Sequence, residues 1–470
     1  MHILKVFSLF VAFMSAINGN AQPSNYEISV KLNNYKYDTV FLAYYMGGKT
    51  YVKDTGLVKN GTSVFKGNQK LEKGMYILVQ QSTLLQVSFL VDDNTQRISF
   101  ELDFDHPNKM VVKGSKASAD LVAYLKFVST KRPAFDSLSN LIKETGIGEE
   151  RKKTIQKQID NIDAAVKQYR KEYMLKNPTS LLSLLIKFNL PYEPPVFSGS
   201  DKEKEMQSYL WYKANWFNNA SMGDPRMLRT ENFLKKIDYY IDKLTVQDPD
   251  SIILSIDEVI NRVKSAPESY KFLLIEMLNR YAKSNLVGMD AVYVHLALKY
   301  YETGKAPWTA KDQLAKIVDN AKRLEPILIG KKAPDLEVLT LDGEKTKLSD
   351  FSAEYTILFF WNTDCYNCSK SVSSLLEVEK QFRDKGVKIF SVCTDTANSV
   401  AKLSKEFVSK NKMTVFFNTM APYYQSSFNS KYDIKTTPQL FILDKNKVIK
   451  SKKISADQVK QVLEYLLNKD

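Results

Sequence analysis

Cys365 and Cys368 are the two residues whose type and spacing best suit covalent chemistry. Two thiols separated by two residues fit thiol–disulfide exchange, in which one thiolate attacks a disulfide and the second displaces the partner from the mixed disulfide. Apolar residues recur at helical spacing just after the pair, so Cys365 is predicted at the beginning of a helix. The unpaired backbone N–H groups and the dipole at that position favour thiolate over thiol, and the thiolate is the nucleophile.

The size of this effect is sufficient for reaction near neutral pH. Lowering the pKa of a thiol by one unit takes about 1.4 kcal/mol. A helix terminus supplies roughly 0.3–1 kcal/mol, and up to ~2 kcal/mol when the charge is partly buried. We therefore expect Cys365 to react as a thiolate, and a second thiol one turn further on to release the bound partner.

A zinc site and an inert structural disulfide are the alternative uses of this pair. Tetrahedral zinc needs four ligands, whereas the chain has three cysteines, three histidines and no second paired cluster. The structural disulfide stays open as an alternative, because the spacing is tight and the expected compartment is oxidising. The third cysteine, Cys393, lies in an alternating strand-like stretch and is expected to be a buried core residue. We expect neither a metal nor a cofactor.

The elements that must position the pair alternate between strand and helix. Residues 355–361 form a continuous apolar run that is typical of a buried strand, and residues 362–364 supply polar turn residues. The helix that begins at the pair extends to about Phe382. The further elements expected are a hairpin around Asp342-Gly343, strands at 387–392, 439–443 and 447–450, and helices at 400–411 and through 459–466. This order predicts an α/β domain.

The first residues have the pattern of an export signal. Lys5 precedes an apolar stretch of about twelve residues, and Gly19 and Ala21 are the small residues that a signal peptidase requires near its cut. The stretch is too short to span a bilayer, and no later run reaches that length. We expect residues 1–21 to be removed near Ala21 and the mature chain, without a transmembrane segment, to work in the periplasm or cell envelope.

Composition and charge bound the remaining possibilities. The 470 residues are 44% hydrophobic and 26% charged, which is ordinary for a globular protein of several domains. The net charge of +14 comes from lysines scattered through the chain. Nucleic-acid binding favours basic residues clustered on one element, so we expect no nucleic-acid partner.

The chain is predicted to be multidomain, with an all-β sandwich-like domain at 22–115, an all-α region at 116–328 and the α/β domain at 329–470. Turn residues separate short alternating runs in the first region, which fits a small sandwich. The runs read as strands are 26–32, 39–44, 75–79, 87–91 and 97–102. Helical spacing of apolar residues then predominates up to about residue 326.

The last region resembles the thioredoxin-fold domain of the TlpA/ResA-like thiol–disulfide oxidoreductases, on several motifs taken together. They are Gly330 with Ala333-Pro-Asp335, Leu341-Asp-Gly343, Leu348-Ser-Asp350, Phe360-Trp361, Cys365-Tyr-Asn-Cys368, Tyr432-Asp-Ile434, Thr436-Thr-Pro438 and Phe441-Ile-Leu-Asp444. The resemblance covers about 140 residues. It implies a thioredoxin fold and a dithiol that exchanges disulfides.

The resemblance also implies roles for individual residues. Cys365 is then the attacking thiol and Cys368 the buried resolving thiol. A cis peptide bond is expected before Pro438, beside the dithiol, with the backbone of Thr437 pairing to an incoming peptide. Trp361, Thr437 and Pro438 are therefore the expected substrate-binding residues.

The regions before this domain resemble accessory modules of uncharacterised function that precede such domains in envelope proteins of Gram-negative bacteria. The β region carries Asp54-Thr55, Asn60-Gly61 and Phe65-Lys-Gly67. The helical region carries Asp224-Pro-Arg226-Met-Leu-Arg229-Thr230 and Pro249-Asp-Ser-Ile252. This likeness implies no catalytic role for the two regions.

The chain departs from the family pattern at four positions around the dithiol. Phe359 and Ser371 stand where such domains keep polar or acidic residues, so two candidate proton acceptors for the resolving thiol are missing. Ser373 replaces a proline, and Asp364 replaces an aromatic residue. The Asp364 carboxylate would raise the pKa of Cys365 and oppose the helix terminus.

These observations predict an exported thiol–disulfide oxidoreductase that acts on protein or peptide thiols and disulfides of the envelope, mainly as a reductant recharged by a membrane electron donor. A binding or scaffold protein whose thioredoxin-like domain has little turnover is the alternative, motivated by the missing acidic residues. Peroxiredoxins share the Ala-Pro-Asp entry, but they carry threonine three residues before the reactive cysteine, whereas Thr363 is two residues before Cys365.

Overall fold

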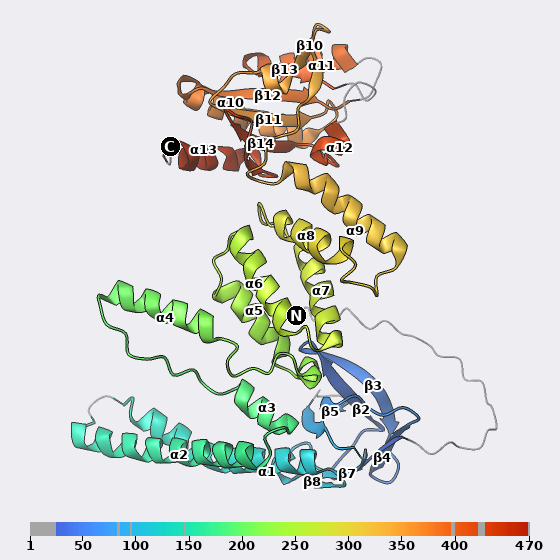
Figure 1. The fold of residues 1–470 in the computed structure, drawn as a ribbon, viewed down its shortest axis with the longest axis vertical. Coiled ribbons are helices and arrows are strands. Elements are labelled where there is room, and N and C mark those ends of the chain that lie inside the picture. Colours follow the sequence, from blue (N-terminus) through green and yellow to red (C-terminus); the bar gives the residue numbers. More distant parts are fainter. Residues whose placement is uncertain are drawn as a thin grey trace, which may run out of the picture. The chain divides into compact units, whose positions relative to one another are not determined.

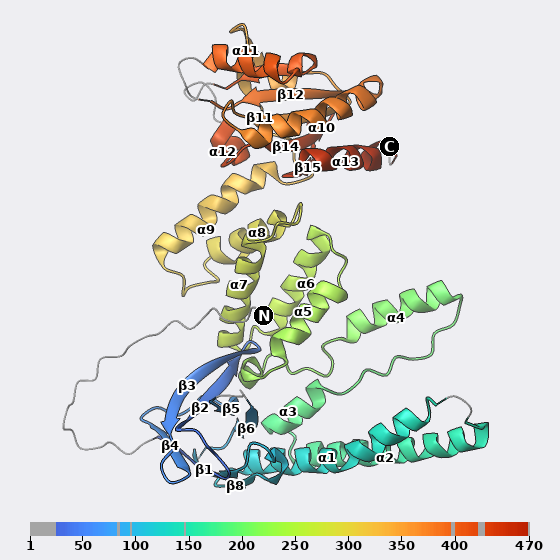
Figure 2. The same ribbon diagram turned by 180° about the vertical axis from the view of Figure 1, so that it is seen from behind.

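The computed structural model describes residues 25–81, 85–94, 96–144, 147–395, 400–421 and 428–468. It confirms the predicted multidomain class, because β-sheets come first, helices follow, and a mixed sheet with helices closes the chain (Figure 1, and from behind in Figure 2). The predicted signal peptide and its cleavage near Ala21 lie outside the described residues. Within the described ranges, no helix combines the length and the apolar character that crossing a bilayer requires.

The contacts divide the chain into two compact units, which are described separately below. The first contains residues up to 195 together with 217–235, and the second contains 196–216 together with the residues from 236 onward. The domain boundaries expected at 115/116 and 328/329 stay predictions.

The β region of the first unit forms two four-stranded sheets, in the orders β4-β1-β7-β8 and β3-β2-β5-β6. Their strands are β1 (Tyr26–Leu32), β2 (Thr39–Met46), β3 (Lys49–Leu57), β4 (Thr62–Gly67), β5 (Gly74–Gln80), β6 (Gln86–Val91), β7 (Arg97–Leu102) and β8 (Val111–Lys113). Apart from the edge strand β3, the strands of both sheets turn alternate residues towards one shared core. Phe89 of β6 and Phe100 of β7, whose ring centroids are 4.9 Å apart, connect the two sheets across this core. The arrangement is the sandwich expected from the alternating runs.

Three helices belong to the same unit: α1 (Lys116–Leu141), α2 (Glu149–Lys176) and α3 (Leu181–Phe188). Ser115 caps α1 by accepting the N–H of Ser118, and Ser180 caps α3 by accepting the N–H of Ser183. Leu181 and Leu182 of α3 are buried with Leu90 of β6, so the short helix closes one side of the β region.

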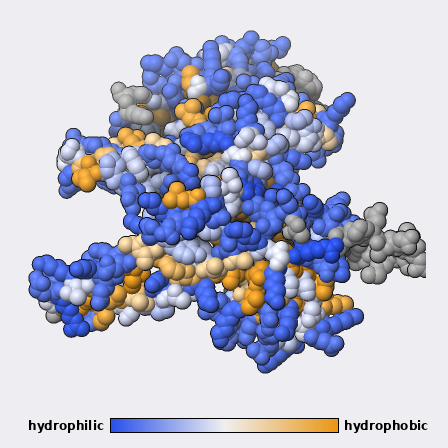
Figure 3. Space-filling model, turned by 60° about the horizontal axis from the view of Figure 1, so that its bottom comes forward, coloured by the Kyte–Doolittle hydropathy of each residue, from blue (hydrophilic) through white to orange (hydrophobic). Residues whose placement is uncertain are grey.

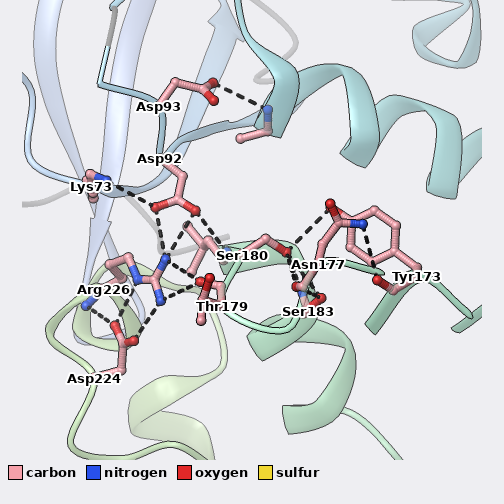
Figure 4. Close-up of polar contacts among 12 residues, drawn as sticks. Lys73, Asp92, Asp93, Tyr173, Asn177, Thr179, Ser180, Ser183, Asp224 and Arg226 are labelled. Carbon is pink, nitrogen blue, oxygen red and sulfur yellow. Dashed lines mark hydrogen bonds and ion pairs between the residues drawn. The ribbon is translucent and has the colours of Figure 1, made fainter. Parts of the chain in front are cut away.

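Arg226 connects three segments of the first unit through its guanidinium group (Figure 4). It donates to both carboxylate oxygens of Asp92 at 2.9 and 3.1 Å, to Asp224 at 2.7 Å, and to the carbonyl oxygen of Thr179 at 3.1 Å. Partial burial opposes ionisation of Asp224, but the hydrogen bonds from Arg226 outweigh it and lower the pKa of that carboxyl group. The Asp224-Pro-Arg226 motif is therefore accounted for by a structural polar network.

The second unit contains a group of helices that precedes the C-terminal sheet. They are α4 (Asp201–Asn215), most of α5 (Phe233–Lys243), α6 (Pro249–Arg262), α7 (Pro267–Ala282), α8 (Asp290–Leu296), a π-helical turn (Ala297–Glu302) and α9 (Lys311–Leu324). Each of α6, α7 and α8 buries an apolar face, as the helical spacing predicted.

Asp257 of α6 holds the π-helical turn through a cluster of hydrogen bonds. Its carboxylate accepts His295 Nε2 at 3.0 Å, Lys299 Nζ at 2.7 Å and the hydroxyl of Tyr300 at 2.6 Å. Partial burial alone would raise the pKa of Asp257, but these bonds outweigh it and lower the pKa to about 2. Because the folded state favours the carboxylate, this cluster stabilises the fold above the ordinary pKa of 3.8 and loses that contribution as the pH falls towards 2.

Asp257→Asn is therefore expected to lower the free energy of unfolding by about 2 kcal/mol at pH 7, and the difference from wild type is expected to shrink between pH 4 and pH 2. Urea unfolding at stepped pH, followed by circular dichroism, measures both quantities. Asp319→Asn is the matched control, because Asp319 is an exposed carboxylate on α9. Equal losses in the two variants would contradict this account of the cluster.

The C-terminal part of the second unit is a seven-stranded mixed sheet in the order β10-β9-β13-β12-β11-β14-β15. Its elements are β9 (Glu337–Thr340), β10 (Lys345–Lys347), β11 (Tyr355–Trp361), α10 (Tyr366–Phe382), β12 (Val387–Cys393), α11 (Val400–Lys410), β13 (Phe417–Met420), α12 (Phe428–Tyr432), β14 (Gln439–Asp444), β15 (Ile449–Lys452) and α13 (Val459–Leu467). Strands β11, β12 and β13 run parallel, while β14 pairs antiparallel with β11.

The faces of this sheet are covered by different helices. Every residue of β11 is buried, as its continuous apolar run predicted. Ile357, Phe359 and Trp361 share one core cluster with residues of α10, α11 and α13. Phe360 points to the other face, where its ring lies against Phe428 and Tyr432 of α12. Strand β11 therefore has packed helices on both faces, and its C-terminal end is fixed in position.

The surface agrees with the scattered charge seen in the sequence. Figure 3 shows a face on which hydrophilic residues predominate and hydrophobic residues occur in separate groups. Scattered lysines on such a surface are mainly solvated.

Candidate active site

Cys365 lies at the point where β11 ends and α10 begins. It is the N-cap residue of α10, with extended backbone angles, and its Sγ accepts the backbone N–H of Cys368 at 3.0 Å. This N–H belongs to the first turn of the helix and is shared with the backbone carbonyl oxygen of Cys365, which is also 3.0 Å away. In the reduced protein, the same N–H and the helix dipole would stabilise a thiolate at Cys365.

The two sulfur atoms differ in access to solvent. Cys365 and Cys368 are joined by a disulfide bond, so the structure has the oxidised form of the pair. Cys365 is half-buried, whereas Cys368 has no exposed surface. An external thiol or disulfide can therefore reach Cys365 first.

The loop before β14 lies directly beside the dithiol. The Thr437–Pro438 peptide bond is cis, as expected from the resemblance. The carbonyl oxygen of Thr437 is 3.5 Å from Cys365 Sγ, and both loop residues are partly exposed. Backbone groups at this position are available to an extended peptide that approaches the sulfur.

Trp361, the third expected substrate-binding residue, is placed differently. Its side chain has no exposed surface, and its ring stacks on Phe407 of α11 with centroids 4.5 Å apart. A fully buried ring cannot contact an incoming peptide, so the expectation that Trp361 binds the substrate is wrong. Trp361 supports the end of β11 from within the core.

None of the four positions that depart from the family pattern places a buried carboxyl group beside the dithiol. Phe359 is fully buried in the core cluster, and the hydroxyl of Ser371 donates to the carbonyl oxygen of Asn367 at 2.9 Å. Asp364 and Ser373 are exposed. None of these side chains offers a buried base to the resolving thiol.

Asp395 is a residue near the site that the sequence reasoning missed. Its carboxylate accepts the backbone N–H of Thr363 at 2.9 Å and the Thr363 hydroxyl at 2.6 Å, two residues before Cys365. These bonds fix the turn that presents the reactive sulfur. The carboxyl ends of neighbouring parallel strands meet at one sheet edge, so a known pairing of β11 with β12 would have placed an acidic residue just after β12 beside the turn after β11.

Cys393 is the core residue that its alternating stretch predicted. It has no exposed surface, and burial raises the pKa of its thiol to about 12. Its Sγ lies 3.5 Å from Asp395 Oδ2. Across the described parts of the chain, no group of three or more His, Cys, Asp or Glu side chains is placed to hold a metal ion.

Comparison with known proteins places this geometry in a family. Residues 329–452 match the AhpC/TSA family, and residues 26–121 match a domain of unknown function, DUF4369. A thiol–disulfide oxidoreductase ResA of Bacillus cereus is 31% identical over 147 residues, which are 31% of this chain and 80% of the relative. The thioredoxin-like protein YneN of Bacillus subtilis is 28% identical over 120 residues, which are 26% of this chain and 68% of that protein.

Among solved structures, a domain of a possible thiol-disulfide isomerase from Cytophaga hutchinsonii has 32% identity and a TM-score of 0.28. The match covers 30% of this chain and 97% of that domain. The expected likeness to TlpA/ResA-like proteins is thus confirmed by the sequence relatives. Through its C-terminal region, the chain belongs to the thioredoxin-superfamily thiol–disulfide oxidoreductases related to ResA.

Proposed function

We propose that this oxidoreductase is exported to the cell envelope and there reduces disulfides of envelope proteins or peptides. The observation that carries the proposal is the pairing of a half-buried Cys365, which keeps some exposed surface at a helix N-cap, with a fully buried Cys368. The export-type pattern of the first residues supports the compartment. A membrane electron donor would return the pair to the dithiol form after each turnover.

The reaction balances in two exchange steps. The Cys365 thiolate attacks one sulfur of the partner's disulfide, forming a mixed disulfide and releasing one partner thiolate. The Cys368 thiolate then attacks Cys365 Sγ and releases the second partner thiolate, and water supplies the protons. The partner's disulfide gains two electrons, and the enzyme becomes the disulfide seen here.

The scaffold alternative is favoured by the missing acidic groups at Phe359 and Ser371, and a trapping experiment separates it from the enzyme. Cys368→Ser is expected to accumulate mixed disulfides between Cys365 and envelope proteins, because the resolving sulfur is gone. Non-reducing gels of alkylated envelope extracts would show these adducts. The double variant Cys365→Ser/Cys368→Ser is the control and should show none. A Cys368→Ser protein without adducts would support a domain that only docks.

A further inference from the structure

A groove of about 690 Å³ lies beside the dithiol in the thioredoxin-like region. Its walls come from the first turns of α10, from the segment that begins at Thr436, and from residues 453–457 before α13. Nothing in the exchange chemistry described above uses this groove, apart from Pro438 at its edge.

The groove is continuous with the reacting sulfur. Pro438 and Asn367 both line it. Pro438 follows Thr437, whose carbonyl oxygen is 3.5 Å from Cys365 Sγ, and Asn367 lies between the two cysteines. A peptide whose disulfide reaches Cys365 therefore has residues next to its own cysteine in a position to enter the groove.

The charges that line the groove are mainly positive. Lys370 and Lys453 are exposed, and neither takes part in an ion pair with any residue in the described ranges. Asp457 is the one acidic residue of the lining, and Asp364 does not belong to it. The N-terminal end of α10 adds a partial positive charge at the same end of the groove. A carboxylate on a bound peptide would therefore be attracted.

The remaining lining is mixed, because Pro438, Leu440, Ile454 and Ala456 add apolar surface to its polar groups, and part of it is held in place by hydrogen bonds. Ser371, Ser374, Thr436 and Ser455 contribute hydroxyl groups, which can hydrogen-bond to the backbone or polar side chains of a bound peptide. The N–H of Lys453 donates to the carbonyl oxygen of Leu440 at 3.0 Å. The N–H of Ser455 donates to a side-chain oxygen at 3.0 Å, closing a capping box. Because this wall is already ordered, little of its conformational entropy is lost when a peptide binds.

We propose that this groove selects acidic peptide segments that flank the cysteine of the substrate disulfide, with Lys370 and Lys453 as the specificity-determining residues. The inference rests on the proposed function and names its substrate class. Lys370 and Lys453 contact the flanking carboxylates, and Cys365 performs the exchange in the same complex.

The test uses the full chain, reduced chemically and freed of reductant. Its substrates are three dimeric peptides of equal length, each joined by one disulfide, with Glu, Ser or Lys beside the cysteine. Rapid quenching and chromatography give the rate at which peptide thiol appears. At low salt the Glu peptide is expected to react roughly threefold to tenfold faster than the Lys peptide, and 0.5 M NaCl is expected to reduce this ratio.

Lys370→Glu/Lys453→Glu should bring the ratio to one or below. Lys380→Glu/Lys460→Glu carries the same change in net charge on exposed positions of α10 and α13 outside the lining, and should keep the wild-type ratio. The inference would be overturned if the Glu and Lys peptides reacted at equal rates or if the Ser peptide reacted faster than the Glu peptide. It would also be overturned if the two double variants changed the Glu-to-Lys rate ratio equally. Failure of the proposed function looks different, since all three peptides would then react no faster than with Cys365→Ser.

Discussion

Cys365→Ser is expected to lower the rate at which the reduced protein cleaves insulin disulfides by at least about a hundredfold, which is about 2.7 kcal/mol of transition-state stabilisation. The reason is access and charge. Cys365 is half-buried, keeps some exposed surface and accepts the N–H of Cys368 at the beginning of α10, whereas Cys368 and Cys393 have no exposed surface. No other sulfur can take over the first attack. Precipitation of the insulin B chain follows the rate directly.

Cys393→Ser is the matched control for this experiment. It removes a sulfur of the same domain that is fully buried and whose pKa is raised to about 12, so the exchange rate should stay at the wild-type level. If Cys365→Ser and wild type cleave insulin at the same rate, the pair has no catalytic role. A structural disulfide, the alternative left open by the sequence, would then be the better account.

The reactive pair could be found from the sequence because its evidence is local. A seven-residue apolar strand, a polar turn and a helical pattern fix where Cys365 stands, and the structure has β11, the turn and α10 in these places. The loop that contains Thr437 could not be placed beside the pair from local evidence. It lies 72 residues further along the chain, and only the resemblance to a family brought it to the dithiol.

Two aspects of the site depended on packing that a residue pattern does not contain. Trp361 ends a strand buried on both faces, so its ring is inside the core although its backbone is near the dithiol. Asp395 reaches the turn before Cys365 because β11 and β12 are parallel neighbours whose ends coincide. Strand neighbours are set by long-range pairing, and the spacing of residues within one segment does not specify them.

Two of the strands that escaped the sequence analysis, β3 and β13, lack a clear alternation of burial. In β3, seven of the first eight positions are at least partly exposed with no inward face, because it is an edge strand paired with β2 alone. In β13, Asn418 and Thr419 interrupt the apolar residues of a four-residue strand, and the Asn418 side chain donates to two nearby carbonyl groups. Short or one-sided strands carry too few apolar residues for a period of two to be detected.

Lys452 and Asp290 form a buried ion pair on which the stability of the second unit is expected to depend. The side chain of Lys452 is 1% exposed and that of Asp290 is 18% exposed. Lys452 Nζ donates to Asp290 and, at 2.7 Å, to the carbonyl oxygen of Ile327. Desolvation lowers the pKa of Lys452, and the Asp290 carboxylate opposes this shift. Removing one partner leaves a buried charge uncompensated, which typically costs about 3–5 kcal/mol.

Asp290→Ala is therefore expected to lower the free energy of opening of the sheet that contains Lys452 by about 3 kcal/mol or more. Asp290→Ala/Lys452→Met should recover most of the loss, because an apolar pair has no charge to desolvate. Glu337→Ala is the matched control: it breaks the exposed Lys347–Glu337 pair, whose N–O distance is 3.0 Å, and should cost less than about 1 kcal/mol. Equal losses for Asp290→Ala and Glu337→Ala would contradict the prediction.

The rate at which Cys393 is alkylated measures the effect of these substitutions. The chain has three cysteines, and two of them form the disulfide, so Cys393 is the one thiol of the oxidised protein. Because it is buried in β12, its alkylation in graded urea reports opening of the sheet that contains Lys452. Asp290 lies in α8, on the far side of the boundary predicted at 328/329. Faster alkylation of Cys393 in Asp290→Ala would therefore mean that the helices before this boundary and the sheet after it are stabilised together.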